Sequence, residues 1–287
     1  MQRHIEFFHR DHFEYRYFRK KAKKSLSQFI DFFWETDFDG LWELYPNGFA
    51  DLLFPNVGYT YMINLGTPFQ IQLDQQLFDI RTDSFLPRYK NIATYHSYGN
   101  KIFGIKFKVS PVVFQKKINF AEYKEYIYPL AYLIDQKVLL EVKSAQSFYE
   151  RVQIISNYYN QVIHQYSGSL KYVEIVTDVL HDAFKNNQFS NSIEQYAQRH
   201  EISSRTLQRY FEAATGINSK QALQMLRIRK AITTFVDEPD HFDATAFGYY
   251  DHSHFYKHIM RFLKAHPVAN IRSHLELIKS TDTKINY

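Results

Sequence analysis

The 287-residue sequence has no cysteine, which excludes disulfide scaffolds, thiolate metal sites and cysteine nucleophiles. Glycine and proline are scarce, with nine and eight residues, so collagen-like and low-complexity chains are excluded as well. The longest uncharged run, residues 52–73, contains prolines, glycines and asparagines and is typical of strands and turns, not of a membrane span. The N-terminus has no apolar core of signal-peptide length. We therefore expect a soluble, cytoplasmic protein with no membrane partner.

Positive charge is concentrated in two places. The chain has 35 basic and 30 acidic side chains and a pI near 9.0. Residues 1–24 carry a surplus of five positive charges, and residues 192–231 hold seven basic against three acidic groups. Residues 232–273 have four basic against five acidic groups. This balance allows a polyanionic partner without requiring one.

Residues 26–120 are predicted to be mainly β. Aromatic and β-branched residues recur in short stretches at 49–54, 59–63, 69–73 and 102–109. Turn signals separate them at 46–48, 55–58, 66–68 and 98–100. Short strands with such regular turns indicate a small barrel or sandwich, and a closed barrel of this size can hold one small ligand in its mouth.

From about residue 121 the pattern becomes helical. Apolar residues spaced alternately three and four apart are Ala145, Phe148, Val152, Ile155, Tyr159, Val162 and Tyr166. They predict a helix over 145–166, which either packs on the β-rich region or forms a dimer seam. Packing on the β-rich region is favoured, because three heptads are the shortest run that indicates a coiled coil. A further helix is predicted over 170–184, and residues 185–191 are the predicted hinge to the last domain.

The region after residue 190 has the outline of two helix-turn-helix units. Asn191 or Ser192 can cap a first helix, and Ser203 can cap a second helix that ends at Gly216. A long helix is predicted over 219–235. A second, similar unit follows over 242–263.

The second helix of the first unit is predicted to expose a polar face. With Leu207, Tyr210 and Phe211 on its buried side, the outward residues at helical spacing are Ser204, Arg205, Gln208 and Arg209. In a helix-turn-helix this helix enters the major groove, where Arg pairs with guanine and Gln with adenine through two hydrogen bonds. The alternative is an ordinary solvated surface, because Arg and Gln favour any exposed helix.

Several segments of this region form a recognisable pattern. They are SIEQYAQRHEISSRTLQRYF at 192–211, Thr215-Gly216, RIRKA at 227–231, and GYYDHSHF at 248–255 with Lys257 and Pro267. Together they resemble the DNA-binding domain of the AraC/XylS family of transcription regulators. The resemblance implies two helix-turn-helix units, joined by one long helix, that bind successive major-groove segments of double-stranded DNA.

The resemblance extends more faintly upstream and is less complete in the second unit. FIDFFW at 29–34, LYPNG at 44–48, DLLF at 51–54 and FGIKF at 103–107 are similar to an uncharacterised N-terminal domain of some of these regulators, which implies a sensory or dimerising module. In the second unit, Asp243 stands where the family usually has an apolar residue, and Lys257 stands where it usually has Arg. Because Lys lacks the planar fork of Arg, we expect the first unit to carry most of the specific binding.

We therefore expect a chain of the α+β multidomain class. Residues 1–135 would form a mainly β sensory domain resembling a barrel or sandwich, residues 136–189 a helical linker that could dimerise, and residues 190–287 an all-α domain with two helix-turn-helix units. The DNA-binding candidates are Ser204, Arg205, Gln208 and Arg209 in the first unit, and His252, Ser253, Tyr256 and Lys257 in the second.

The predicted function is a sequence-specific DNA-binding transcription regulator, modulated through its N-terminal domain. Double-stranded DNA is the predicted partner. An unidentified small-molecule effector, a second copy of the chain and RNA polymerase are further candidates. The alternative is a non-specific DNA-binding or protein-interaction module whose N-terminal domain binds a partner protein.

An enzyme is not expected. A metal-dependent cupin would need His-x-His on a strand with a further His and a carboxylate, whereas residues 26–120 contain one histidine, His96. His254 and His258 are four apart on a predicted helix, but no Glu accompanies them and Lys257 is adjacent. The sequence has no phosphate loop, nucleophile elbow or paired-carboxylate motif. No catalytic residue, metal ligand or cofactor is therefore predicted.

Overall fold

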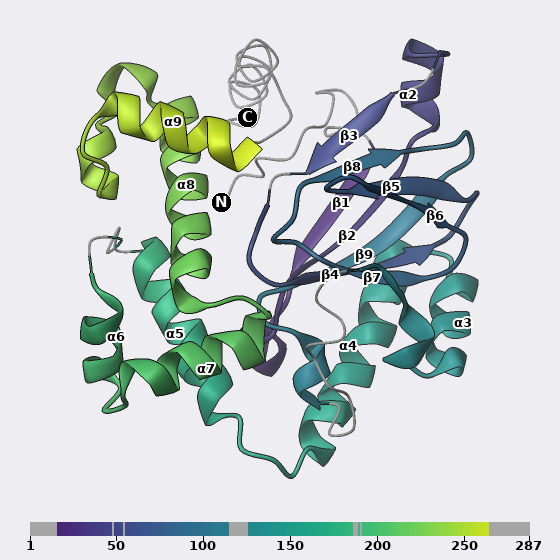
Figure 1. Ribbon diagram of the computed structural model, residues 1–287. Helices are drawn as coiled ribbons and strands as arrows, with labels where there is room; N and C mark the ends of the chain where they lie inside the picture. The colour runs from purple at the N-terminus through teal and green to yellow at the C-terminus, as the bar shows by residue number, and fades with distance from the viewer. Residues whose placement is uncertain are drawn as a thin grey trace.

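Two antiparallel β-sheets face each other in the first half of the chain (Figure 1). The computed structural model describes residues 16–47, 49–53, 55–114, 126–185, 189 and 191–263. The larger sheet has the strand order β1 (Tyr17–Lys21), β2 (Ile30–Asp37), β9 (Lys101–Phe107), β4 (Tyr59–Asn64), β7 (Ser84–Pro87), β10 (Tyr128–Pro129). The smaller sheet has the order β3 (Ala50–Leu53), β8 (Ile92–Tyr95), β5 (Phe69–Leu73), β6 (Gln76–Ile80). The predicted mainly β fold is confirmed, in the form of two packed sheets.

The larger sheet buries both of its faces. Along β4, Tyr61 and Ile63 belong to a core that continues into the helices, which we call the helix-side core. Met62, between them, belongs to a separate core between the two sheets, which we call the inter-sheet core, together with Ile71 of the smaller sheet. This alternation follows from the period of two in a strand, and it confirms the strand predicted over 59–63.

Strand β2 was not among the strands predicted from the alternation of residues. It pairs with β1 on one side and β9 on the other, and most of its side chains are buried. Phe32, Phe33 and Trp34 therefore follow one another without polar interruption, and such a run has no period of two. Trp34 lies across from Gly104 on β9, where a Cβ atom would overlap the indole ring. Glycine is thus required at this position.

One short helix, α2 (Asp39–Leu44), lies beside the sheets. The remaining described helices follow the strands in the chain. They are α3 (Gln136–Ser144), α4 (Phe148–Gln165), α5 (Lys171–Lys185), α6 (Ile193–Arg199), α7 (Ser204–Thr215), α8 (Ser219–Asp237) and α9 (His252–Leu263). Single 3-10 turns are η1 (Lys24–Gln28), η2 (Pro111–Phe114), η4 (Leu130–Tyr132), η5 (Pro239–His241) and η6 (Ala244–Phe247). None of the described helices combines the length and hydropathy that a bilayer-spanning segment needs.

The helix predicted over 145–166 is wrong at its start. Ala145 is the C-terminal cap of α3, and α4 begins at Phe148 because the Ser147 side chain accepts a hydrogen bond from the Glu150 amide. The apolar face of α4, including Ile155, is buried in the helix-side core. This face is therefore used inside the chain, which favours packing on the sheet over the dimer seam.

A buried ion pair fixes α4 to the larger sheet. Arg151 of α4 lies 3.2 Å from a carboxylate oxygen of Glu35 on β2, and both side chains are buried. Arg151 also donates to the carbonyl oxygen of Ala145, at 2.6 Å. The more exposed Lys101 contacts the same carboxylate at 3.1 Å. Glu35 and Arg151 thus satisfy charges that would be costly to bury alone.

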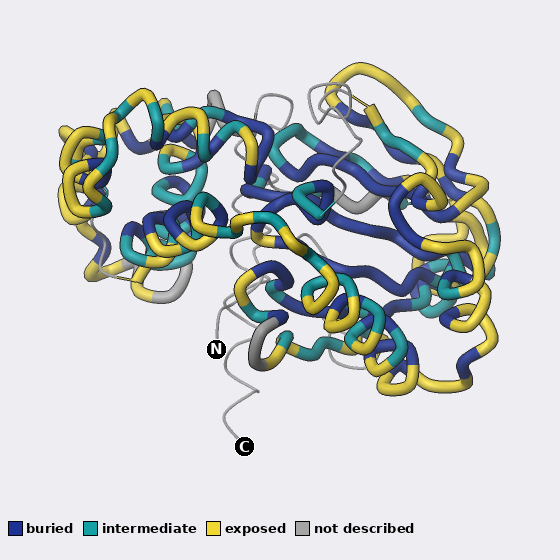
Figure 2. Tube along the Cα trace, turned by 90° about the horizontal axis from the view of Figure 1, so that it is seen from below, coloured by how far each residue is buried: buried dark blue, intermediate teal, exposed yellow. Residues whose placement is uncertain are grey.

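The helix-side core extends from the sheet into the first helix-turn-helix unit. Phe107 of β9, Val176 of α5 and Phe211 of α7 all belong to it. The second unit has its own core, in which Ile228 of α8 packs with residues such as Phe255 of α9. Figure 2 shows the buried residues along the strands and on the inner sides of the helices. Helix α8 is therefore the element that joins the second unit to the rest.

Removal of Arg151 is expected to destabilise the protein. Arg151→Met leaves the Glu35 carboxylate buried with Lys101 as its remaining cation, so we expect a loss of about 3 kcal/mol in the free energy of unfolding. The double variant Glu35→Gln, Arg151→Met should recover most of this loss. Urea denaturation measures both, with Arg16→Met as a control, since Arg16 pairs with Asp37 at the surface and should change stability by less than about 1 kcal/mol. An unchanged urea midpoint for Arg151→Met would contradict the expectation.

Candidate nucleic-acid interface

The first unit is built from local signals that the sequence carries. Ser192 and Gln195 form a capping box at the start of α6, in which each side chain binds the backbone N–H of the other residue. Ser203 caps α7 by accepting a hydrogen bond from the Thr206 amide at 3.1 Å. Gly216 ends α7 with a φ of 78°, a conformation that glycine adopts without strain. These caps confirm the predicted limits of both helices.

Helix α7 presents opposite faces to the core and to solvent. Leu207 and Phe211 are fully buried. Arg205, Gln208 and Arg209 are exposed on the other side. The interior of the first unit thus leaves three long polar side chains near the N-terminal end of the helix, as the sequence predicted.

Two details qualify this exposed face. Ser204, at the first position of α7, is partly buried. The Gln208 amide lies 3.5 Å from a carboxylate oxygen of Glu212, one turn further along. Gln208 would have to give up this weak contact in order to bind a base.

The second unit is shorter than the first. Its leading helix is the 3-10 turn η6, which Gly248 ends with a φ of 75°. The Asp251 carboxylate accepts a hydrogen bond from the His254 amide at 2.6 Å and so caps α9. The helical segment, turn and helix predicted over 242–263 are thus present, with the first of them reduced to one turn.

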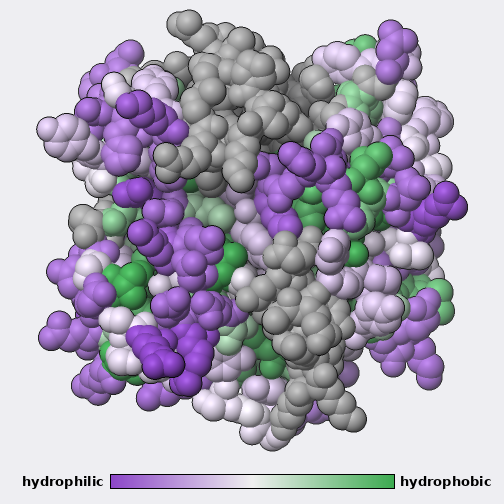
Figure 3. Space-filling model, viewed as in Figure 1, coloured by the Kyte–Doolittle hydropathy of each residue, from purple (hydrophilic) through white to green (hydrophobic). Residues whose placement is uncertain are grey.

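Helix α9 also exposes polar side chains opposite its core. Phe255 is fully buried, whereas His252, Ser253, Tyr256 and Lys257 are exposed. In Figure 3, which has the orientation of Figure 1, the side formed by α6 to α9 is mostly hydrophilic, with small hydrophobic patches. All the candidate side chains, Ser204 in part, are therefore accessible on the two helices α7 and α9.

Two of the candidates on α9 are held by aromatic contacts. The His252 ring meets Phe242 edge-on at 5.6 Å, and the Tyr256 ring meets Phe235 edge-on at 6.2 Å. His254 and His258, which were considered as a metal-binding pair, both have protein partners. His254 Nδ1 lies 3.4 Å from the Tyr250 amide, and His258 Nδ1 lies 2.7 Å from the Tyr249 hydroxyl.

Sequence reasoning did not find two arginines on α8. The Arg227 guanidinium lies over the Tyr249 ring at 4.6 Å and contacts the second unit. Arg229 is buried and donates to the carbonyl oxygen of Pro55, 3.0 Å away in the β-rich part. Their position within the RIRKA segment was part of the family pattern, but the partners of both lie too far along the chain for spacing to predict them.

A backbone hydrogen bond also ties the first unit to the β-rich part. The Ser110 amide, just after β9, donates to the carbonyl oxygen of Ala214 in α7, at 2.6 Å. Ala214 and Ser110 are both fully buried. This bond holds α7 beside the sheet, and the Arg229 contact holds α8 there.

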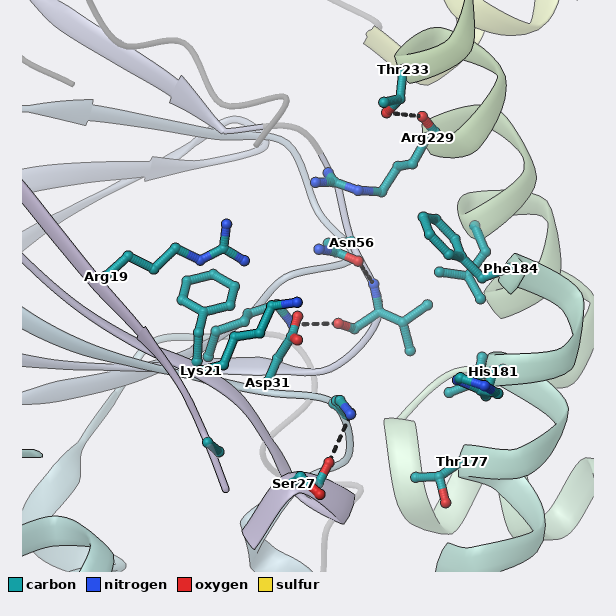
Figure 4. A pocket seen from close by; sticks show the side chains of 17 residues that line it. Arg19, Lys21, Ser27, Asp31, Asn56, Thr177, His181, Phe184, Arg229 and Thr233 are labelled. Atoms are coloured by element: carbon teal, nitrogen blue, oxygen red, sulfur yellow. Dashed lines mark hydrogen bonds between the residues drawn. The ribbon is translucent and has the colours of Figure 1, made fainter. Parts of the chain in front are cut away.

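A cavity of about 340 Å³ lies between the β-rich part and the helices (Figure 4). Arg19 and Lys21 of β1 approach it from one side, and Phe184 of α5 and Arg229 of α8 from the other. Its described lining includes five lysine and arginine side chains and one carboxylate, that of Asp31. The cavity is therefore positively charged.

Parts of the cavity lining are already fixed by hydrogen bonds. Lys106 donates to the carbonyl oxygen of Phe107 at 2.7 Å, and Lys108 donates to that of Ser27 at 2.7 Å. The Arg19 guanidinium stacks over the Phe32 ring at 3.9 Å. Leu180 of α5 and neighbouring apolar side chains complete the wall. The cavity thus combines cations with an apolar surface.

The cavity between the two described sheets is small. A cavity between the two sheets, lined by residues such as Trp34, Met62 and His96, has about 20 Å³. That volume holds about one water molecule. The His96 ring stacks on Phe38 at 3.4 Å, which fills the space further. The space between the described parts of the two sheets is therefore too small for a ligand larger than water, and the position of an effector site stays a prediction.

Residues 196–271 match the family model described as a helix-turn-helix domain. This segment is an AraC-type helix-turn-helix domain. The match supports the coarse prediction of a DNA-binding transcription regulator, and with it the prediction that the chain is not an enzyme. No curated protein matches the sequence.

Solved structures of ToxT from Vibrio cholerae are similar in outline. ToxT of strain O395 is 11% identical, covers 92% of this chain and 96% of its own, and has a TM-score of 0.45. A second crystal form has 11% identity, 80% and 94% coverage and a TM-score of 0.44. ToxT bound to an unsaturated fatty acid has 12% identity, 92% and 95% coverage and a TM-score of 0.42. At TM-scores below 0.5 these likenesses carry no argument.

Asp243, a departure from the pattern of the AraC-type domain, has a structural role. Its carboxylate accepts hydrogen bonds from the Thr245 amide at 2.8 Å and from the Thr245 hydroxyl at 2.7 Å, and so caps η6. The hydroxyl bond is the main reason that the pKa of Asp243 lies below its ordinary value of 3.8. The sequence also departs from the family pattern at Lys264, where a glycine is usual, and this residue lies outside the described residues.

Loss of this cap is expected to destabilise the AraC-type domain in a pH-dependent way. Because folding lowers the pKa of Asp243, its contribution is complete above the ordinary value of 3.8 and disappears as the pH falls through the lowered pKa. The difference in stability between the wild type and Asp243→Ala should therefore be constant near neutral pH and shrink in acid. Thermal unfolding across pH measures it, with the exposed Asp240→Ala as control. A difference that persists unchanged in acid would contradict the role of the ionised cap.

Proposed function

We propose that the protein is a sequence-specific DNA-binding transcription regulator in which α7 and α9 enter successive segments of the major groove. The observation that carries the proposal is the exposed face of α7, where Arg205, Gln208 and Arg209 lie opposite the buried Leu207 and Phe211. A helix of this kind presents its outward N-terminal side chains to base edges. Arg and Gln have the hydrogen-bonding groups that read guanine and adenine.

The two units contribute unequally in this proposal. Arg209 is one of two arginines that α7 exposes, and a guanidinium binds guanine through two hydrogen bonds. Helix α9 offers Lys257, whose ammonium acts as a point charge. The first unit therefore reads most of the sequence. The second unit, with His252, Ser253 and Tyr256 beside Lys257, mainly places the domain on the sugar-phosphate backbone.

Regulation is proposed to act through the contacts between the β-rich part and the helices. Residues 1–135 would be the sensory part, 136–189 the linker and 190–287 the reader, within the cytoplasm. The Ser110–Ala214 hydrogen bond and the Arg229–Pro55 contact connect the sensory part to α7 and α8. A change at these contacts would alter the orientation of residues 190–287 toward DNA, in a single chain or in a dimer. It would thereby alter the contact of the bound protein with RNA polymerase.

The effector is proposed to be a small amphiphilic anion bound in the charged cavity. Arg19 and Lys21 on one side and Arg229 on the other supply the positive charge, and Leu180 and Phe184 supply apolar surface. An anion that binds Arg229 would compete with the Pro55 carbonyl oxygen for the same guanidinium. Binding would thereby be coupled to the contact that holds α8. Capture of a partner protein, with no small molecule stabilising the chain, would favour the alternative in which the sensory part is an interaction module.

The unequal roles of the two units predict different effects of two alanine variants. Arg209→Ala should weaken binding to the selected site by about 1–3 kcal/mol and relax the preference at one base position. Lys257→Ala should weaken binding to all sequences alike and reduce the salt dependence by about one unit of slope. The measurement is selection of bound genomic fragments by the wild type, followed by affinities of both variants for matched and mutated sites. A sequence-selective loss in Lys257→Ala would contradict this division, and a wild type with no sequence preference would overturn the proposed function.

The charged cavity predicts a preference for anions over neutral analogues. A panel of small carboxylates, each paired with its uncharged amide, is tested by thermal unfolding; a bound carboxylate at about 100 times its Kd should add about 2.7 kcal/mol of stability. Arg19→Gln should reduce the stabilisation, because Arg19 lines the cavity. Arg16→Gln is the matched control, since Arg16 precedes the same strand but pairs with Asp37 instead. Equal shifts with carboxylates and amides would contradict the role of charge.

A further inference from the structure

Three residues from three elements connect α8 to the second recognition helix. Arg227 lies midway along α8, Tyr249 lies in the turn that precedes α9, and His258 lies within α9. The Arg227 guanidinium stands over the Tyr249 ring at 4.6 Å and contacts the carbonyl oxygen of Gly248 at 3.4 Å. The Tyr249 hydroxyl is 2.7 Å from Nδ1 of His258. One side chain of α8 thus holds both the turn and, through Tyr249, the helix that follows it.

Tyr249 is well suited to transmit this contact. Its side chain is 3% exposed, and its ring also meets the Phe255 ring at 5.3 Å. Burial raises the pKa of its hydroxyl to about 12, so the hydroxyl keeps its proton near neutral pH. The ring is therefore fixed on one face by the guanidinium and at its tip by the imidazole.

This network differs in kind from the apolar packing between α8 and the second unit. The core that Ile228 shares with Phe255 is apolar, and apart from the edge-on contacts of the Phe235 ring its packing is not directional. A planar guanidinium over a ring, with a hydrogen bond to the adjacent carbonyl, has a preferred distance and orientation. The second unit does not share the helix-side core, so its orientation depends on what α8 provides.

We infer that Arg227, through Tyr249 and His258, sets the angle between the two recognition helices and thereby the spacing of the two DNA segments that the protein accepts. The inference rests on the proposed function. Adding one base pair between two segments moves the second by about 3.4 Å and turns it by about 34–36° around the duplex axis. A rigid connection rejects that change, whereas a connection held by the apolar core alone tolerates it. Arg227 is thus a positioning residue that touches no base.

The experiment measures affinity as a function of spacing. The two segments bound by the wild type are first found by selection, and duplexes are then made with the selected spacing and with one or two base pairs added or removed. The wild type is expected to prefer the selected spacing by about tenfold over a shift of one base pair, which corresponds to about 1.4 kcal/mol.

Two variants loosen the network by different means. Arg227→Lys keeps the charge but loses the planar fork, and Tyr249→Phe keeps the ring but loses the bond to His258. Both are expected to reduce the tenfold preference to within about threefold, while binding to the first segment alone stays unchanged. Arg199→Lys is the matched control, because the Arg199 guanidinium lies over the Tyr196 ring at 5.6 Å within the first unit, away from α9. It should keep the preference of the wild type.

The outcomes separate this inference from the function on which it rests. If both variants lose the same factor of affinity at every spacing, their role is only structural and the inference is overturned. A wild type that binds its selected sequence equally at all spacings also overturns it, while the proposed function stands. A wild type that shows no sequence preference overturns both. Should Arg227→Lys fail to fold, as seen by circular dichroism, Tyr249→Phe decides the result.

Discussion

The apolar core that the larger sheet shares with α5 and α7 is the constraint on which the rest of the structure depends. Phe107 at the end of β9 meets Tyr159 of α4 at 5.5 Å, and the same core continues through Val176 to Phe211. Burial of aromatic side chains on this scale is the main favourable term in the packing of the chain. This shared core turns the apolar side of α7 toward the sheet. The polar side of α7 therefore faces solvent.

Helices α7 and α9 are held by different kinds of contact. Helix α7 is fixed by the shared core and by the Ser110–Ala214 hydrogen bond, so its position follows that of the sheet. Helix α9 belongs to a separate core and reaches the rest of the molecule through α8. Directional contacts are accordingly found on α8, where Arg227 faces the second unit and Arg229 faces the β-rich part. One turn of α8 thus contacts both the second unit and the β-rich part.

The parts of the fold that could be predicted from sequence are those fixed by neighbouring residues. The caps Ser192 and Ser203, the ending of α7 at Gly216 and the exposed face around Arg209 follow from spacings of three or four residues. Strand β2 was not predicted because burial on both faces removes the alternation of polar and apolar residues. Ala145 was assigned to the same helix as Phe148 because it fits the heptad spacing, although it lies before the Ser147 cap. The cavity and the Arg229–Pro55 contact could not be predicted, since the two residues are 174 positions apart.

The shared core also limits how far the chain can be divided. Helix α5 lies before residue 190, yet it packs against α7, where Tyr172 meets Tyr210 at 6.0 Å. A fragment that began at residue 190 would lack this cover and expose the apolar side of α7. Such surfaces promote aggregation. Exchange of residues 190–287 between related chains would therefore have to carry α5, from the proposed linker, along with them.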